Sequence, residues 1–170
     1  MSDAPALDPD MLERLRRGVP LVLAPTGRFR FDGADVTHPR VEAALRAGLD
    51  VTEAGEPVVH LGAQWCYLTV EDCVLRGTGV LEREGGLWLR LDDGRDVPLP
   101  HETLWEEPDR GLRASVPSQR SGRLMSVRLT NAAQVELSAW IEFDEQTDHA
   151  TLVHGGLRAP IPSSPPAPEG

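Results

Sequence analysis

Two stretches of the chain alternate hydrophobic and polar or aromatic residues on both sides of a short glycine turn. The first runs from Pro57 to Asp72 around Gly62-Ala63, and the second from Thr151 to Ile161 around Gly155-Gly156. Alternation with a period of two, broken by a two-residue glycine turn, predicts a β-hairpin. We therefore expect two antiparallel strands in each stretch.

Helix signals occur at three places. A capping Asp8, Pro9 and a closing Gly18 predict a short amphipathic helix over residues 10–17. A second helix begins at Pro39, after Thr37 or His38 as the cap, and its apolar stripe includes Leu49. A third follows Thr130 or Asn131 and extends to about Glu142, with Trp140 in its buried stripe.

Further strands follow from alternation and turn signals elsewhere in the chain. They are predicted at Leu21–Leu23, Arg28–Phe31, Gly79–Glu82, Leu87–Leu91, Asp96–Leu99, Gly111–Val116 and Leu124–Leu129. The segment from Ser163 to Gly170 is rich in Pro and Ser, which predicts a disordered tail.

The order strand, helix, strand, turn, strand occurs twice, at residues 28–70 and 124–161. Thr37 precedes Gly62 by 25 residues, and Thr130 precedes Gly155 by the same number. The predicted fold is α+β: two βαββ-like repeats joined by a β-meander, with mostly antiparallel sheet. The predicted segments are an N-terminal helix (1–18), first repeat and meander (19–99), second repeat (100–162) and tail (163–170).

Composition and charge limit the partners, reaction mechanisms and cellular location that we expect for this chain. The net charge of −10 repels phosphate backbones and anionic membranes, so we expect neither a nucleic-acid nor a membrane partner. All 17 basic residues are arginine, so the chain cannot form a Schiff base through a lysine side chain. No apolar run is long enough to span a bilayer and the start is unlike a secretory signal, so we expect a cytoplasmic protein.

The first hairpin carries the candidate site. Adjacent carboxylates at Glu71 and Asp72 point to opposite faces if they end a strand, so one of them could line a cleft. The alternative is that this carboxylate caps a turn or pairs with an arginine. Trp65 and Tyr67 share one hairpin face, which is core if a helix covers it. If the face is open, the two rings form a ligand or partner surface with His38, Arg40 and Glu56 nearby.

Metal, cofactor and nucleophile motifs are not found. The five histidines lack the spacing of metal ligands, and no phosphate loop or nucleophile elbow is present, so we expect no metal or cofactor. Cys66 and Cys73 lie in apolar strand contexts and are interpreted as free thiols.

Several short motifs resemble a bacterial family known as domain of unknown function 1285. They are Phe31-Asp32-Gly33, Val36, His38-Pro39-Arg40, Val70-Glu71-Asp72, Arg128-Leu129-Thr130 and Glu136-Leu137. The chain departs from the family pattern at Cys73-Val74, Leu91–Gly94 and Gln134-Val135. The resemblance implies an α+β fold of repeated units and a role in binding or signalling, without an established reaction.

Three functions are compatible with these patterns. We favour a non-enzymatic module that binds a small molecule or a protein partner. The first alternative is a small hydrolase-like enzyme that uses Glu71 or Asp72. The second is a structural domain that forms a homodimer through an open sheet face.

Overall fold

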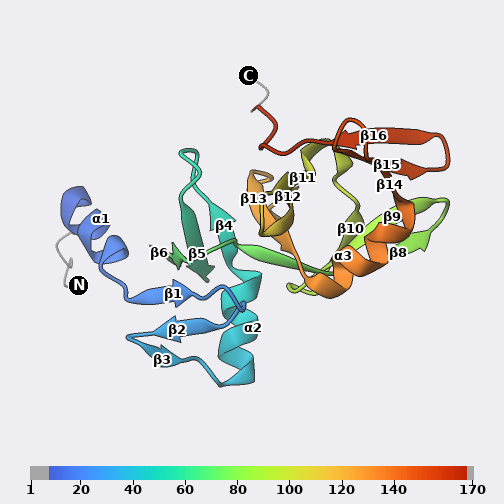
Figure 1. The fold of residues 1–170 in the computed structure, drawn as a ribbon. Coiled ribbons are helices and arrows are strands. Elements are labelled where there is room, and N and C mark those ends of the chain that lie inside the picture. Colours follow the sequence, from blue (N-terminus) through green and yellow to red (C-terminus); the bar gives the residue numbers. More distant parts are fainter. Residues whose placement is uncertain (1–7, 168–170) are drawn as a thin grey trace. The chain divides into compact units, whose positions relative to one another are not determined.

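The computed structural model describes residues 8–167, and it divides the chain into two compact units (Figure 1). The first unit comprises Met1–Asp72 together with Ser118–Arg123, and the second comprises Cys73–Pro117 and Leu124–Gly170. The start of the chain, over residues 1–7, and the last three residues of the predicted tail lie outside the described residues.

The described residues of the first unit form two helices and two sheets. Its helices are α1 (Pro9–Arg17) and α2 (Pro39–Ala47). A four-stranded sheet has the order β3 (Ala34–Asp35), β2 (Phe29–Phe31), β1 (Leu21–Leu23), β7 (Thr69–Val70). A three-stranded antiparallel sheet has the order β4 (Leu49–Val51), β5 (Pro57–Leu61), β6 (Gln64–Tyr67).

Helix α2 ends earlier than the sequence predicted, and Leu49 belongs to strand β4 instead of the helix stripe. Gly48 is the last residue bonded to the helix, and its carbonyl accepts a hydrogen bond from the His60 amide at 2.8 Å. A Cβ atom at Gly48 would lie 2.0 Å from the His60 carbonyl oxygen. The close approach of these two backbones therefore fixes where the helix gives way to the strand.

The first predicted hairpin is present, and its second strand is shorter than expected. The turn is Gly62-Ala63, with Gly62 at φ 62°, and the register pairs His60 with Trp65. The chain leaves this sheet after Tyr67, and β7 pairs with β1 in the other sheet in parallel. Glu71 and Asp72 consequently lie in a bend after β7, not at the end of a hairpin strand.

The second unit is built on a six-stranded sheet with one helix and a smaller sheet. The large sheet has the order β10 (Asp96–Pro98), β9 (Gly86–Leu91), β8 (Leu75–Arg83), β13 (Leu124–Leu129), β12 (Gly111–Pro117), β11 (Trp105–Glu107). Helix α3 (Asn131–Leu137) leads to a sheet of β14 (Ile141–Asp144), β15 (His149–His154) and β16 (Leu157–Ile161). Short 3₁₀ helices lie at His101–Thr103 and Ser138–Trp140.

The third predicted helix was too long. Helix α3 ends at Leu137, and Ile141 starts strand β14, which pairs with β15. A β-branched Ile followed at the second position by Phe143 suits a strand better than a helix end. Trp140 is only half-buried, with its ring edge-to-face on His154 at 6.0 Å.

The α+β class and the mostly antiparallel pairing are confirmed, because only β1–β7 and β13–β8 are parallel among the pairings of the described residues. In both repeats the helix is followed by a three-stranded meander, so the repeat has one strand more than the predicted βαββ unit.

The predicted segment 19–99 joined the first repeat to the strands β8–β10. The structure places those strands in the same sheet as β11–β13, in the second unit.

Cys66 and Cys73 are free thiols, as predicted. No helix in residues 8–167 is long and apolar enough to cross a membrane. Within the described part of the predicted tail, Pro165, Pro166 and Ala167 line a cavity with Trp105.

The contact at Gly48 gives a first prediction. Gly48→Ala should lower the free energy of unfolding by about 1–3 kcal/mol, because the added Cβ meets backbone atoms of β5 that cannot rotate away. Urea unfolding followed by tryptophan fluorescence measures this loss.

The matched control is Gly156→Ala, at a hairpin turn with a φ outside the positive region and nothing within 4 Å of the added Cβ. This variant should stay within about 0.5 kcal/mol of the parent protein. Equal stability of the two variants would contradict the role given to Gly48.

Candidate functional site

One face of the β5–β6 hairpin gathers three rings. Since alternate residues of a strand share a face, the register places His60, Trp65 and Tyr67 on the same side. The Trp65 and Tyr67 rings meet edge-to-face at 5.3 Å between centroids, and His60 lies 6.3 Å from Trp65. All three side chains are half-buried, so this face is neither closed core nor open surface.

Helix α1 holds this face through charged side chains. The guanidinium carbons of Arg16 and Arg17 lie 4.0 Å and 3.9 Å from the ring centroids of Trp65 and Tyr67, respectively. Arg17 also donates to both carboxylate oxygens of Glu56, at 3.0 and 3.2 Å. This pairing lowers the pKa of the Glu56 carboxyl and raises the pKa of Arg17.

A second link between α1 and the hairpin is a phenol–carboxylate hydrogen bond. The Tyr67 hydroxyl donates to Glu13 Oε1 at 2.8 Å, and this bond raises the pKa of Tyr67. The same Glu13 oxygen accepts from Arg17 Nε at 3.0 Å. Tyr67, Glu13, Arg17 and Glu56 therefore form one connected network across the edge strand β6.

Strand β4 contributes a buried carboxylate, Asp50, to the floor of the same face. Its Oδ1 accepts from Ser121 Oγ at 2.5 Å and from the Val51 amide at 2.9 Å. Burial opposes ionisation of Asp50, but these donors and Ser118 outweigh it and hold the pKa of the carboxyl below its usual range. Asp50 is consequently a buried anion held by the Ser118–Arg123 loop.

His60 lies beside this anion. Its Nε2 is 3.7 Å from Asp50 Oδ2, beyond hydrogen-bond distance. Burial and the positive charge of Arg120 lower the pKa of His60, although Asp50 acts in the opposite direction. The imidazole is therefore neutral at neutral pH.

These groups surround a cavity of about 490 Å³ within the first unit, a size typical of small-molecule sites. Its polar and aromatic lining comprises Asp50, Thr52, Glu53, Glu56, His60, Trp65, Tyr67 and Arg123. We call this cavity the hairpin pocket. Its lining carries three carboxylates and Arg123, and Arg17, which is bonded to Glu56, adds a second positive charge beside it.

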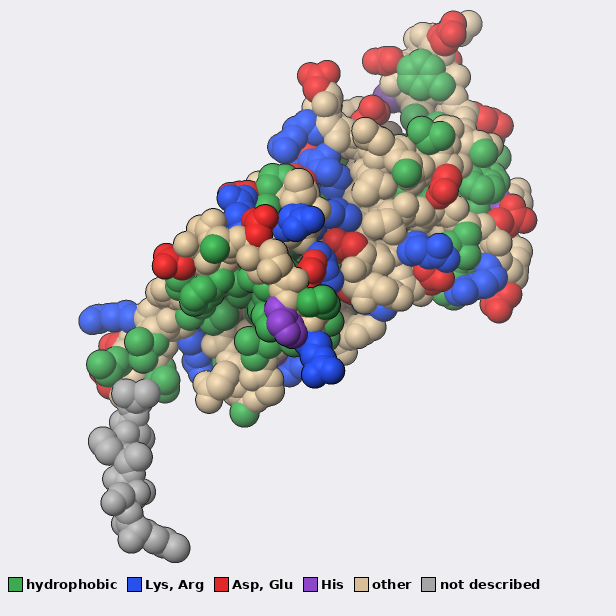
Figure 2. All heavy atoms as spheres, turned by 90° about the horizontal axis from the view of Figure 1, so that it is seen from below, with side chains coloured by type: hydrophobic (Ala, Val, Ile, Leu, Met, Phe, Trp, Pro, Cys, Tyr) green, Lys and Arg blue, Asp and Glu red, His purple; other side chains and the backbone are tan. Residues whose placement is uncertain are grey.

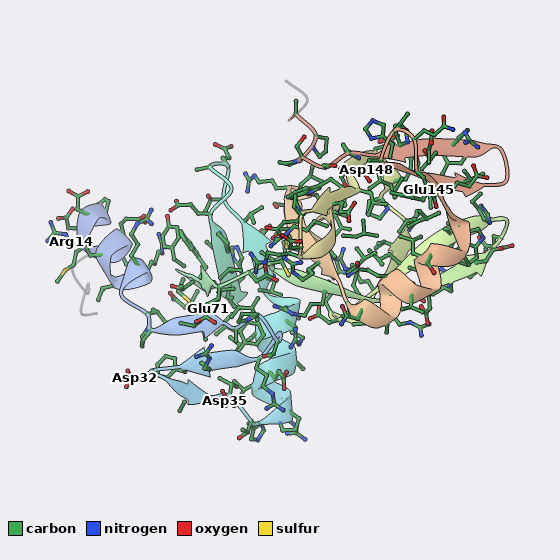
Figure 3. All side chains as sticks on the ribbon, viewed as in Figure 1. Arg14, Asp32, Asp35, Glu71, Glu145 and Asp148 are labelled. Carbon is green, nitrogen blue, oxygen red and sulfur yellow. The ribbon has the colours of Figure 1, made fainter. Side chains whose placement is uncertain are left out.

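Three of the predicted site residues, Glu56, Trp65 and Tyr67, line the hairpin pocket. The other four do not. Glu71 accepts from Arg30 Nη2 at 2.8 Å, next to β1 (Figure 3). Asp72 is the last residue of its unit before the chain enters the second, and His38 and Arg40 are exposed at the start of α2.

The sequence interpretation missed Asp50, Glu53 and Arg123 as pocket residues. Asp50 had a visible signal, since it is a charge between two apolar residues, Leu49 and Val51. Arg123 had none, because its contacts at 3.3 Å with the Val51 carbonyl and at 3.6 Å with Glu53 join positions about 70 apart in the chain.

The second unit offers weaker sites. His154 Nε2 lies 3.3 Å from Glu82, and His154 and His101 both line a cavity of about 370 Å³ at two hairpin turns. Glu107 is held by Arg110, Arg113 and Arg128. In residues 8–167, no group of three or more His, Cys, Asp and Glu side chains could hold a metal ion. On the face drawn in Figure 2, arginines lie scattered among acidic side chains.

The fold places the chain among α+β proteins. Its defining feature is a unit of a strand, a helix and a three-stranded meander, which occurs twice in the chain. Two solved structures are similar to this fold. A DUF1285 family protein from Silicibacter pomeroyi DSS-3 matches with a TM-score of 0.65 and 14% identity, over 95% of this chain and 89% of that chain. A DUF1285 family protein from Shewanella baltica OS155 matches with a TM-score of 0.55 and 13% identity, over 72% of this chain and 92% of that chain.

The resemblance predicted from the short motifs is therefore confirmed, at the level of the fold. No protein-family model matches the sequence. No curated protein matches it either. The similarities say nothing about a ligand, so any function rests on the geometry of the pocket.

The bond between Ser121 and Asp50 gives a second prediction. Ser121→Ala should lower the free energy of unfolding by about 1–3 kcal/mol, because a buried carboxylate loses a donor. Thermal and urea unfolding measure the change. The control is Ser138→Ala, which removes an exposed hydroxyl bonded to the Val135 carbonyl and should cost no more than about 0.5 kcal/mol. Equal losses in both variants would refute the role of Ser121.

The lowered pKa of His60 gives a third prediction. In the unfolded chain the pKa of this imidazole is about 6.5, and folding lowers it. As the pH falls, the unfolded state therefore takes up the proton first. The stability that neutral His60 contributes is complete above the unfolded pKa and declines as the pH falls toward the lower, folded pKa. In His60→Gln, the loss of unfolding free energy between pH 7.5 and pH 5 should be smaller than in the parent protein. Urea unfolding at both pH values measures this, and identical losses would contradict it.

Proposed function

We propose that this chain is a non-enzymatic small-molecule-binding module of bacterial origin, serving signalling, and that its first unit binds a compact cationic ligand in the hairpin pocket. The observation that carries the proposal is that the Trp65 and Tyr67 rings and the exposed carboxylate of Glu53 line one cavity of about 490 Å³. An amine or a guanidinium is the ligand group that suits such a lining.

The aromatic rings support a cation because they already accept two. Arg16 lies over Trp65 and Arg17 over Tyr67, each at about the distance of a cation–π contact. Glu53 adds a carboxylate whose side chain is 92% exposed, so it can turn toward a ligand. Asp50 adds negative electrostatic potential to the pocket while it keeps its hydrogen bonds from Ser121 and the Val51 amide.

Two of the pocket carboxylates, Glu56 and Asp50, are poorly placed to act as a general base. Both oxygens of Glu56 are bonded to Arg17, and Asp50 accepts from Ser121 and from the backbone. A general base needs a free oxygen or nitrogen within reach of the substrate, and these carboxylates are committed to the fold. Glu71, one of the two residues named for the hydrolase alternative, is paired with Arg30.

The fourth prediction tests the pocket with agmatine, which carries a guanidinium and an ammonium group. Agmatine should raise the melting temperature of the full chain, and calorimetric titration should give a Kd. Glu53→Gln should weaken this binding by about two- to fivefold, the effect of losing one exposed charge pair. The substitution keeps the shape of an exposed side chain and should leave the fold intact.

The matched control is Glu71→Gln, which removes a carboxylate of the same unit that does not line the pocket. Its agmatine affinity should equal that of the parent protein. An affinity that falls equally in both variants would show only a response to net charge. Absence of agmatine binding would refute the cationic ligand.

A further inference from the structure

Helix α1 lies along edge strand β6 without burying its apolar stripe. None of its residues, Pro9–Arg17, is fully buried. Leu15 keeps 55% of its surface exposed, and Leu61 on the facing hairpin keeps 48%. The helix is held instead by the network of Glu13, Arg17 and Tyr67. Two half-exposed leucines therefore face a common space that the fold itself does not fill.

That space is a groove of about 430 Å³ within the first unit, separate in its lining from the hairpin pocket except for Trp65. Its apolar wall comprises Leu12, Leu15, Val19, Val59, Leu61 and Cys66. Burial raises the pKa of the Cys66 thiol, so this side chain contributes a neutral surface at neutral pH. We call this space the α1 groove. A hydrocarbon chain is the ligand part that fits such a wall.

One cation, Arg16, lines the α1 groove. Its side chain is half-buried and its guanidinium carbon lies 4.0 Å from the Trp65 ring centroid. Among residues 8–167 it has no carboxylate partner, whereas its neighbour Arg17 is bonded to Glu13 and Glu56. A guanidinium stacked on an aromatic ring and left without an anion is suited to accept a planar carboxylate through two parallel hydrogen bonds.

We propose that the α1 groove binds a single aliphatic carboxylate, with its chain against the leucines and its head on Arg16. The net charge of −10 repels a multiply charged phosphate more strongly than a ligand with one negative charge, so among anions a single carboxylate is the better fit. The single arginine and the long apolar wall match that composition. This site is independent of the cationic ligand proposed for the hairpin pocket.

The fifth prediction uses decanoate below its micelle concentration, with decanol as the neutral probe of the same chain length. Calorimetric titration of the full chain should show binding of both, with decanoate the tighter ligand, and octanoate should bind more weakly than decanoate. Arg16→Gln should weaken decanoate binding roughly tenfold or more and leave decanol binding unchanged. A fluorescence change on binding should disappear in Trp65→Phe.

The matched control is Arg14→Gln, which removes an exposed arginine of the same helix that does not line the groove (Figure 3). Its affinities should equal those of the parent protein. Leu61→Ser should weaken both ligands severalfold, because it removes apolar wall without touching the cation. Equal decanoate affinity in Arg16→Gln and Arg14→Gln would overturn the proposal, as would a parent protein that binds neither ligand.

Two further measurements separate the remaining explanations. Agmatine binding should be insensitive to Arg16→Gln, and decanoate binding insensitive to Glu53→Gln, so each site can fail without the other. Sedimentation velocity tests whether a second copy of the chain fills the groove instead. A dimer that Leu61→Ser disperses, in a protein that does not bind decanoate, would assign the groove to self-association and overturn the proposal.

Discussion

The first unit depends on a buried anion. Asp50 is 4% exposed in the middle of β4, where an uncompensated carboxylate would strongly oppose folding. Compensation comes from Ser118 and Ser121, which belong to the first unit although they follow β12 in the chain. The floor of the hairpin pocket is therefore completed only by residues that the chain supplies about 70 positions later. The charge of the pocket has the same origin, because these donors keep Asp50 ionised.

The attachment of α1 follows a different principle from that of a packed core. Its contacts to the hairpin are cation–π pairs, an arginine–carboxylate pair and a phenol–carboxylate bond, all at half-exposed positions. Such contacts are directional and individually weak in water. They fix the helix over the edge strand while leaving apolar side chains uncovered, which a hydrophobic interface would not do. The α1 groove is the direct result.

Local signals predicted much of the fold. The positive-φ turn at Gly62, the cap at Asp8 and the alternation in Leu87–Leu91 each depend on near neighbours, and each has the predicted structure. The errors occur where a contact with a residue distant in the sequence determines whether a segment is helix or strand. Leu49 joins a strand because β5 lies against Gly48, and Ile141 does so because β15 pairs with it. The candidate site was half predicted for the same reason: Trp65 and Tyr67 share a strand face, whereas Arg123 reaches Val51 from a loop that no local pattern connects to it.

Trp65 lines both the hairpin pocket and the α1 groove, and the two differ in the charge they favour. The hairpin pocket combines two aromatic rings with the exposed carboxylate of Glu53, a lining that suits the cationic ligand proposed for it. The α1 groove combines an apolar wall with Arg16, which has no carboxylate partner among residues 8–167, and this lining suits the aliphatic carboxylate proposed for it. Because Arg16 already occupies a face of the Trp65 ring, an anion that binds Arg16 does not compete for that face. The Trp65 ring is therefore common to both linings, whereas the charged groups proposed to hold the two ligands, Glu53 and Arg16, are different.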